Sequence, residues 1–278
     1  MRDATHPAQS SAIAVAAIAA CSIFLAQQLL RFGFTNANRL GVVVASVFAV
    51  VLWLARSATA SAAAVGGLIV ATLTLGTIRQ PSGAWWRTAL LPLVVLLLFT
   101  LVATHFRRGQ KEQLGLAEPK AGRRASQVCA NLGAASFAAI LYASDLPRVP
   151  MLLALAAALV EATADTVSSE TGQAMQGKTF LLTTGRMVAA GVDGGISLAG
   201  TVAGCAAGAA VAATSAICLG LSARQAVLCW GAGIAGIFFD SWLGATLERK
   251  GVLSNDAVNF LSTCCSALLA GAAGAMLV

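Results

Sequence analysis

Charge is scarce in this sequence. Of its 278 residues, 58% are hydrophobic and only 10% are Asp, Glu, Lys or Arg, and the mean hydropathy is +0.81. A soluble domain usually carries about 25% charged residues, so the composition excludes that class. Segments of about ten residues with alternating polarity, which mark a membrane β-barrel, are also missing. The sequence therefore predicts an all-α, polytopic integral membrane protein.

The sequence also lacks the common signatures of nucleotide and metal enzymes. It contains no GxxxxGK[ST] phosphate-binding loop, no kinase lysine, glutamate and DFG set, and no HExxH. Its two histidines, His6 and His105, have no partners at metal-ligand spacing, and its seven cysteines form no CxxC pair. Any chemistry on nucleotides therefore requires a site specific to membrane proteins.

What remains is a series of apolar runs rich in alanine and glycine. At about 20 residues per span we expect about nine transmembrane helices, near 12–30, 40–55, 61–78, 88–106, 128–143, 150–164, 196–219, 226–247 and 259–278. The first run is long for a signal peptide and has no convincing cleavage site, so we expect it to stay as a helix. The sixth is the shortest and carries Glu161, so we expect it to be broken or to cross incompletely.

The basic residues predict the orientation. With nine spans, two thirds of the 18 Lys and Arg fall on the side that holds the N-terminus. By the positive-inside rule that side is cytoplasmic. We therefore expect a protein of the bacterial inner membrane with its N-terminus and its site facing the cytoplasm. The net charge of +7 is explained by these loops, and no nucleic-acid partner is expected.

The distribution of polar residues predicts three parts. Residues 1–106 are apolar helices with no acid after Asp3 and are predicted to be a scaffold. Residues 107–127 form a basic loop in which Gly115, Pro119 and Gly122 argue against a continuous helix. Residues 128–278 hold most of the acids and are predicted to carry the site.

Three acids near one membrane boundary are the main candidates for chemistry. Glu161 and Asp165 are four residues apart and share one face of a helix, and Glu170 follows. Like charges at this spacing repel each other unless a cation lies between them or one is protonated. A few hard oxygen ligands, with room for water and phosphate, suit Mg²⁺. The alternative is that Asp165 or Glu170 caps a helix or pairs with Lys178 or Arg186.

Asp240 is a further acid, within a predicted span. It shares a helical face with Gly233, Gly236 and Gly244, so we expect a close helix neighbour. The alternative is a packing role, with the carboxylate hydrogen-bonded to Ser or Thr. A similar stripe without charge, Gly200, Gly204 and Gly208, predicts packing only. The predicted metal ligands are Glu161, Asp165, Glu170 and Asp240.

Basic and amide side chains accompany the acids. Cations beside carboxylates suit a phosphate bridged to a metal ion, although each basic residue alone is explained by topology. The predicted phosphate-binding set is Lys120, Arg123, Lys178 and Arg186, with Asn131, Asn255 and Asn259 nearby. In the turn VDGGIS, Gly194 and Gly195 could bring backbone N–H groups to a phosphate.

Six segments in the second half of the chain have distinctive sequences. They are KAGRRASQVCANLG (120–133), DTVSSETG (165–172), GKTFLLTTGR (177–186), GVDGGISLAGTVAG (191–204), FFDSWLGATLERKG (238–251) and NDAVNFLS (255–262). In this order and spacing they resemble the transmembrane protein 19 family, which includes the phytyl-phosphate kinase of tocopherol synthesis in plants and cyanobacteria. The resemblance covers about 120–278.

The resemblance implies an integral membrane kinase that converts a prenyl monophosphate to the diphosphate, with CTP or ATP as donor. Mg²⁺ would be held by the acids, and the partners would be the prenyl phosphate and membrane lipids. We expect Asp165, Glu170 and Lys178 to be catalytic. By position, the resemblance adds Ser169 and Thr179 to the phosphate-binding set. Gly185-Arg186-Met187 departs from relatives, which often have an aromatic residue before the basic one.

A cation- or proton-coupled transporter or lipid flippase is the alternative function. Buried acids and glycine-rich helices also suit such a protein. The two halves of the chain differ sharply in charge and glycine content and show no convincing inverted repeat, which disfavours it. A CDP-alcohol phosphotransferase is disfavoured because its DxxDGxxAR signature is missing.

Overall fold

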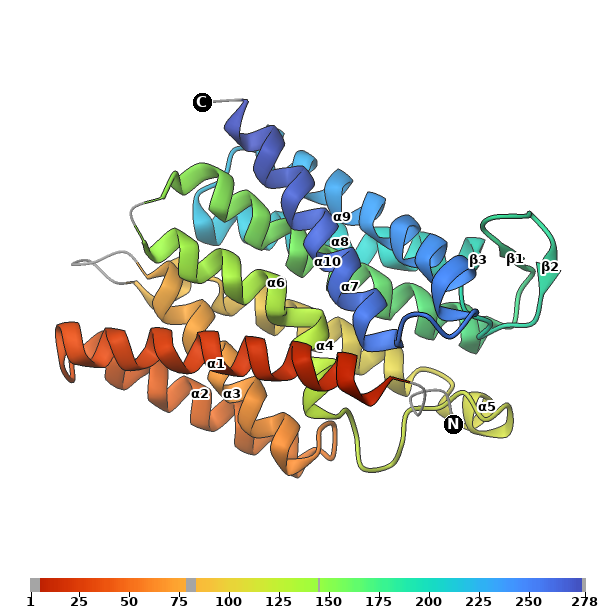
Figure 1. Cartoon of the computed structure of the whole chain (residues 1–278), viewed down its shortest axis with the longest axis horizontal. Helices are drawn as coiled ribbons and strands as arrows, with labels where there is room; N and C mark the ends of the chain where they lie inside the picture. Colours follow the sequence, from red (N-terminus) through yellow and green to blue (C-terminus); the bar gives the residue numbers. More distant parts are fainter. Residues whose placement is uncertain (1–5, 79–83, 145, 277–278) are drawn as a thin grey trace.

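The computed structural model describes residues 6–78, 84–144 and 146–276. The helices form one bundle, shown in Figure 1. The elements are α1 (Pro7–Phe32), α2 (Asn36–Leu54), α3 (Ala60–Thr77), the 3₁₀ turn η2 (Trp85–Arg87), α4 (Leu90–His105), α5 (Arg108–Gln113), α6 (Ala125–Ala143), α7 (Arg148–Met175), β1 (Thr179–Leu181), β2 (Met187–Val188), β3 (Gly195–Ser197), α8 (Leu198–Leu219), α9 (Ala223–Leu243), the π-helical turn η3 (Gly244–Glu248) and α10 (Asn255–Ala275).

Eight of the nine expected spans are confirmed as long apolar helices. Eight helices in the described part of the chain are long and apolar enough to cross a membrane. The ninth expected span, 88–106, is α4, an apolar helix of 16 residues that rises about 24 Å and is short for a bilayer core of about 30 Å. The expected end of the last span at 278 lies outside the described residues.

The sixth expected span is corrected by the structure. Instead of a short or broken segment, α7 is a continuous helix of 28 residues, and it is the longest one described. The sequence analysis ended this span at residue 164 and expected a break because the span carries Glu161. Glu161 and the acids after it instead lie within the helix, because neighbouring helices enclose its second half and supply polar contacts there.

α7 is the centre of the bundle. It packs against α4, α6, α8, α9 and α10, and its apolar part is almost wholly buried. A helix that is apolar all round is expected to be enclosed by protein in this way. The stripe Gly200, Gly204 and Gly208 of α8 lies against α7, and a side chain at Gly204 would clash with the carbonyl of Ala164. The predicted packing role of this stripe is confirmed.

A small sheet was not predicted. β1 pairs antiparallel with β2 and with β3, in the order β2-β1-β3, and lies beyond the end of the helices in Figure 1. Its turn closes at Gly185, whose φ of 63° favours glycine. The strands are only two or three residues long, which is why the sequence pattern did not reveal them.

The loops expected on one side of the membrane lie at one end of the bundle, which we call the basic end. The N-terminal segment meets the connection between α9 and α10 there, where the Gln9 side chain donates to the carbonyl of Val252 at 2.9 Å. α5 and the sheet lie at the same end, whereas α10 ends at the opposite one (Figure 1). Which side of the membrane the basic end faces remains a prediction.

Candidate functional site

Three of the predicted acids converge between α7, α9 and α10. The carboxylate of Glu161 is close enough to that of Asp165 for repulsion, and Asp240 interacts with both. Ser262 of α10 donates a hydrogen bond to Asp240 Oδ2 at 3.3 Å. We call Glu161, Asp165 and Asp240 the acid cluster. It lies in the half of α7 nearer the basic end.

Two glycines bring the acid cluster together. A side chain at Gly233 of α9 would clash with Val160, and one at Gly236 would reach Glu161 Cγ at 2.6 Å. The absence of Cβ atoms therefore lets α9 approach α7 closely enough for their acids to meet. The close helix neighbour expected for Asp240 is confirmed.

Arg123 is the basic side chain whose positive charge attracts the carboxylate of Asp165. Its position is fixed by the backbone: the Arg123 N–H donates to the carbonyl of Ser57, and the Thr59 N–H donates to the carbonyl of Arg123, both at 3.0 Å. Gly122 has a φ of 79°, and any side chain there would clash with the backbone of Ser57. The turn between α2 and α3 thus holds Arg123 beside the acids.

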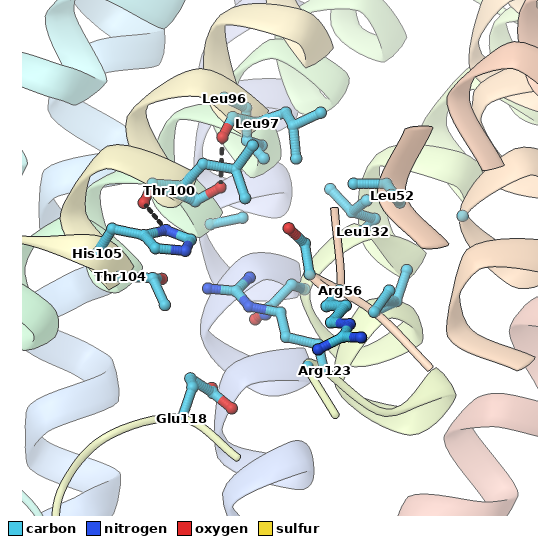
Figure 2. A pocket seen from close by; sticks show the side chains of 18 of the residues that line it. Leu52, Arg56, Leu96, Leu97, Thr100, Thr104, His105, Glu118, Arg123 and Leu132 are labelled. Atoms are coloured by element: carbon cyan, nitrogen blue, oxygen red, sulfur yellow. Dashed lines mark hydrogen bonds between the residues drawn. The ribbon is translucent and has the colours of Figure 1, made fainter. Parts of the chain in front are cut away.

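A pocket opens next to Arg123 at the basic end. α4 supplies one wall, including Leu96 and Leu97, while α2, α3, α6 and the loops at residues 56–58 and 118–123 supply most of the rest. In Figure 2 these leucines lie at the top, and Arg56, Arg123 and Glu118 lie toward the bottom. The pocket therefore has an apolar depth and a polar mouth. Ala162, directly after Glu161 on α7, also lines it, so the pocket adjoins the acid cluster.

The acid cluster has an excess of negative charge. Three carboxylates lie together, Arg123 acts on one of them, Asp165, and Glu248 adds a further negative charge near Asp240. Glu161 is 1% exposed, and its Oε1 has no hydrogen-bond partner among the described residues. Such an arrangement is costly unless a cation approaches or a proton is bound.

The protein side chains alone do not complete a metal site. In the described ranges no three Asp, Glu, His or Cys side chains are grouped closely enough to hold an ion. Mg²⁺ commonly takes only one or two carboxylates from the protein and the rest of its ligands from phosphate and water. The cluster fits Mg²⁺ in that form, as part of a complex with phosphate.

Glu170 lies apart from the other predicted metal ligands. At about 100° per residue it is rotated by roughly 140° from Asp165 around α7. Its carboxylate forms a buried ion pair with Lys111 of α5, and the Thr104 hydroxyl donates to it at 3.5 Å. The expected partners Lys178 and Arg186 are not its partners here. We therefore assign Glu170 to joining α5 and α7 rather than to the metal set.

Several other predicted residues lie away from the cluster. Lys120, Lys178, Arg186, Ser169 and Asn255 are exposed, and the Ser169 hydroxyl donates to the carbonyl of Thr166 within its own helix. Thr179 is buried, and its hydroxyl donates to the carbonyl of Gly177. Only Asn131 and Asn259 are partly buried near the cluster: Asn131 lines the pocket, and Asn259 lies one turn before Ser262.

The glycine-rich turn packs against η3 in this structure. The N–H of Gly195 donates to the carbonyl of Val192 at 2.9 Å, so it is already engaged. Gly194, with a φ of 75°, lies so close to Ala245 of η3 that a side chain would clash. We therefore assign this turn to packing rather than to phosphate binding.

Sequence reasoning missed some polar residues. Lys111 is fully buried, and Arg56 and Arg108 line the pocket, although all three were explained as topology charges. Asp256, in the first turn of α10, is fully buried with neither carboxylate oxygen hydrogen-bonded to a described residue. A carboxylate there is favoured by the helix dipole. The sequence could have pointed to Asp256 through its place in the first turn of a helix. It gave no comparable signal for the arginines.

The fold and the site define a helical membrane protein with a carboxylate cluster enclosed between its helices. The chain belongs to the integral membrane protein family DUF92, which matches residues 43–267. No solved structure matches the chain.

Three relatives illustrate the range of the family. An uncharacterised membrane protein of Methanocaldococcus jannaschii is 38% identical over 113 residues, 40% of this chain and 47% of the relative. Protein VTE6, chloroplastic, of Arabidopsis thaliana is 29% identical over 220 residues, 73% of this chain and 62% of that protein. An uncharacterised membrane protein of Synechocystis is 33% identical over 201 residues, 64% of this chain and 71% of the relative. The matches thus cover about half of the archaeal relative and less than two thirds of VTE6.

Proposed function

We propose that this protein is a membrane kinase that transfers the terminal phosphoryl group of a nucleoside triphosphate to a prenyl monophosphate. The observation that carries the proposal is the meeting of Glu161, Asp165 and Asp240 beside Arg123, next to a pocket with an apolar depth. The resemblance of residues 120–278 to the transmembrane protein 19 family, which includes a phytyl-phosphate kinase, supports the same reaction class, and VTE6 is 29% identical. The likeness is distant, so the substrate is part of the proposal.

The reaction needs little covalent chemistry from the protein. An oxygen of the acceptor monophosphate bonds to the terminal phosphorus of the donor, and the bond from that phosphorus to the bridging oxygen breaks, releasing the nucleoside diphosphate. A phosphate monoester is mostly a dianion at neutral pH, because its second pKa is about 6, so its attacking oxygen carries no proton. The lack of a catalytic histidine or cysteine is therefore consistent with this reaction.

The chain's own groups would position and neutralise the reactants. Asp165 and Asp240, which are partly exposed, would hold Mg²⁺ bound to the donor phosphates, with Glu161 behind them. Mg²⁺ supplies neutralisation of the charge on the transferred group when bound. Arg123 would bind the acceptor phosphate and keep it in line with the donor. Lys178 and Arg186 would contribute only if the exposed sheet moved toward the cluster.

The test uses purified protein in nanodiscs with Mg²⁺, phytyl or geranylgeranyl monophosphate, and each of ATP, CTP, GTP and UTP. The expected result is a prenyl diphosphate, detected by mass spectrometry with one of the donors and lost in Asp165→Asn. Glu112→Gln is the matched control, because Glu112 is exposed on α5 and its ion pair with Arg108 lies at the surface. A folded wild-type protein that forms no product with any donor would contradict the proposal and favour a transporter.

A further inference from the structure

The pocket beside Arg123 has two chemically different ends. Its depth is lined by apolar side chains of three helices, α2, α4 and α6, namely Phe48, Leu52, Leu93, Leu96, Leu97, Leu101, Val128 and Leu132. Its mouth carries Arg56, Arg108, Arg123 and Asn131, with Glu118 as the one acid in the lining. This distribution suits a ligand with an anionic head and an apolar chain.

Arginines outnumber acids by three to one among the residues that line the pocket. Arg108 forms an ion pair with Glu112 at 3.0 Å and donates to the carbonyl of Glu118 at 3.2 Å, so it is partly engaged. Arg56 and Arg123 both line the mouth of this pocket (Figure 2). Two guanidinium groups at one opening can together bind a phosphate monoester, whose oxygens match their donor geometry.

The backbone of Arg56 fixes where its side chain begins. Its φ of 53° is left-handed and closes the C-terminal end of α2. The Arg56 N–H donates to the carbonyl of Trp53, and the Ser57 N–H donates to that of Leu52. Arg56 follows α2 directly, and in this conformation its side chain lines the mouth of the pocket.

The shape of the pocket favours one chain over two. Its lining residues on α4 run from Leu93 to His105, a rise of about 18 Å. The cavity nevertheless measures only about 100 Å³, less than the roughly 150 Å³ of a cavity that holds benzene. A long space with so small a volume is narrow. It admits the first carbons of one slender chain, with the phosphate at its open mouth, and leaves no room for a second chain alongside.

We propose that this pocket binds the acceptor as a single-chain phosphate monoester, with the phosphate between Arg56 and Arg123 and the proximal part of the chain along α4. The inference rests on the proposed function for the identity of the ligand. It assigns a role to helices that the sequence analysis treated as scaffold. It also places the acceptor phosphate next to Asp165, because Arg123 interacts with both the pocket and that carboxylate.

The first test is photolabelling of the full protein in nanodiscs with a linear alkyl phosphate that carries a diazirine in its chain. The expected result is label on peptides of α2 and α4, displaced by geranylgeranyl monophosphate and not by diacyl phosphatidic acid. Label recovered mainly from α8 to α10, spread evenly over the helices, or displaced equally well by phosphatidic acid would overturn the proposal. The assay needs no nucleotide. Labelling in the pocket without any diphosphate formation would therefore contradict the proposed kinase activity but support the proposed binding site.

A second test fills the pocket. A Cβ at Gly66 of α3 would have only the Leu52 side chain within 4 Å, at 3.5 Å, so Gly66→Leu should extend into the free space. We expect the labelling affinity to fall by about tenfold or more, as for a lost apolar chain contact. Gly231→Leu is the matched control, because a Cβ at Gly231 of α9 would meet nothing within 4 Å and lies far from the pocket lining. Equal affinity in both variants would overturn the assignment.

Discussion

Lys111 and Glu170 form a buried ion pair between α5 and α7, although 59 residues separate them in the chain. The Lys111 ammonium also donates to the carbonyls of Ala103 and Thr104, at 3.0 and 2.8 Å, and so caps the C-terminal end of α4. One lysine thus joins three helices at the basic end. The pair fixes the start of the loop that later supplies Arg123.

We predict that Lys111→Met is strongly destabilising. The substitution leaves the Glu170 carboxylate buried without its partner, which typically costs about 3–5 kcal/mol. For a protein of this size that corresponds to a fall of roughly 5–10 °C in the thermal midpoint, measured by scanning fluorimetry in detergent.

The double variant Lys111→Met, Glu170→Gln is the control for this pair. It removes both charges, so the thermal midpoint should recover most of the decrease caused by Lys111→Met. If Glu170 were instead a metal ligand, Glu170→Gln alone would abolish turnover without lowering the midpoint, and the double variant would stay as unstable as Lys111→Met. That pattern would contradict the structural role.

The second prediction concerns the contact of α9 with the acid cluster. Gly236→Ala places a methyl group against Glu161 and Ser266, so we expect a loss of about 1–3 kcal/mol and a lower thermal midpoint. Gly231→Ala on the same helix points into open space and should be neutral or stabilise by up to about 1 kcal/mol. Equal midpoints for the two variants would show that α9 does not pack as described.

The third prediction concerns Arg123. Arg123→Gln keeps the backbone hydrogen bonds to the turn between α2 and α3 but removes the charge. We expect KM for the prenyl monophosphate to rise by about tenfold or more, because a charge-assisted contact to phosphate contributes roughly 1.5–3 kcal/mol. Arg224→Gln, an exposed arginine at the opposite end, is the control. An unchanged KM in Arg123→Gln would remove this residue from the acceptor site.

The fourth prediction concerns the cation. A ligand that binds only the folded protein raises its thermal midpoint, so Mg²⁺ together with a nonhydrolysable nucleotide should stabilise the wild-type protein. The shift should be lost in Asp165→Asn and Asp240→Asn and retained in Glu112→Gln. A shift of the same size in all of these variants would place the Mg²⁺-nucleotide complex away from the acid cluster.

Much of the fold was predictable because membrane burial constrains sequence strongly. Apolar runs of the right length revealed the helices, and the glycines at 233 and 236 revealed the close approach of α9. The length of α7 was not predictable in the same way. Glu161 suggested a short or broken segment. The helix instead continues because α9, α10 and Arg123, which are distant in the sequence, pack around its acids in the tertiary structure.

The candidate site was predictable in part, for a related reason. Isolated acids in apolar runs stand out, so Glu161, Asp165 and Asp240 were identified from sequence. Basic residues at helix ends do not stand out, because topology alone explains them. Lys111 and Arg56 were therefore missed, and their roles follow from contacts between residues that are distant in the sequence.

The most direct test of the central claim follows the phosphoryl group itself. Wild-type protein and Asp165→Asn in nanodiscs are incubated with Mg²⁺, geranylgeranyl monophosphate and a donor nucleotide labelled in its terminal phosphate. The account predicts label in the terminal phosphate of geranylgeranyl diphosphate with the wild-type protein, and a loss of at least about a hundredfold in Asp165→Asn. Label that stays in the nucleotide, or appears only as inorganic phosphate, in folded wild-type protein would contradict it.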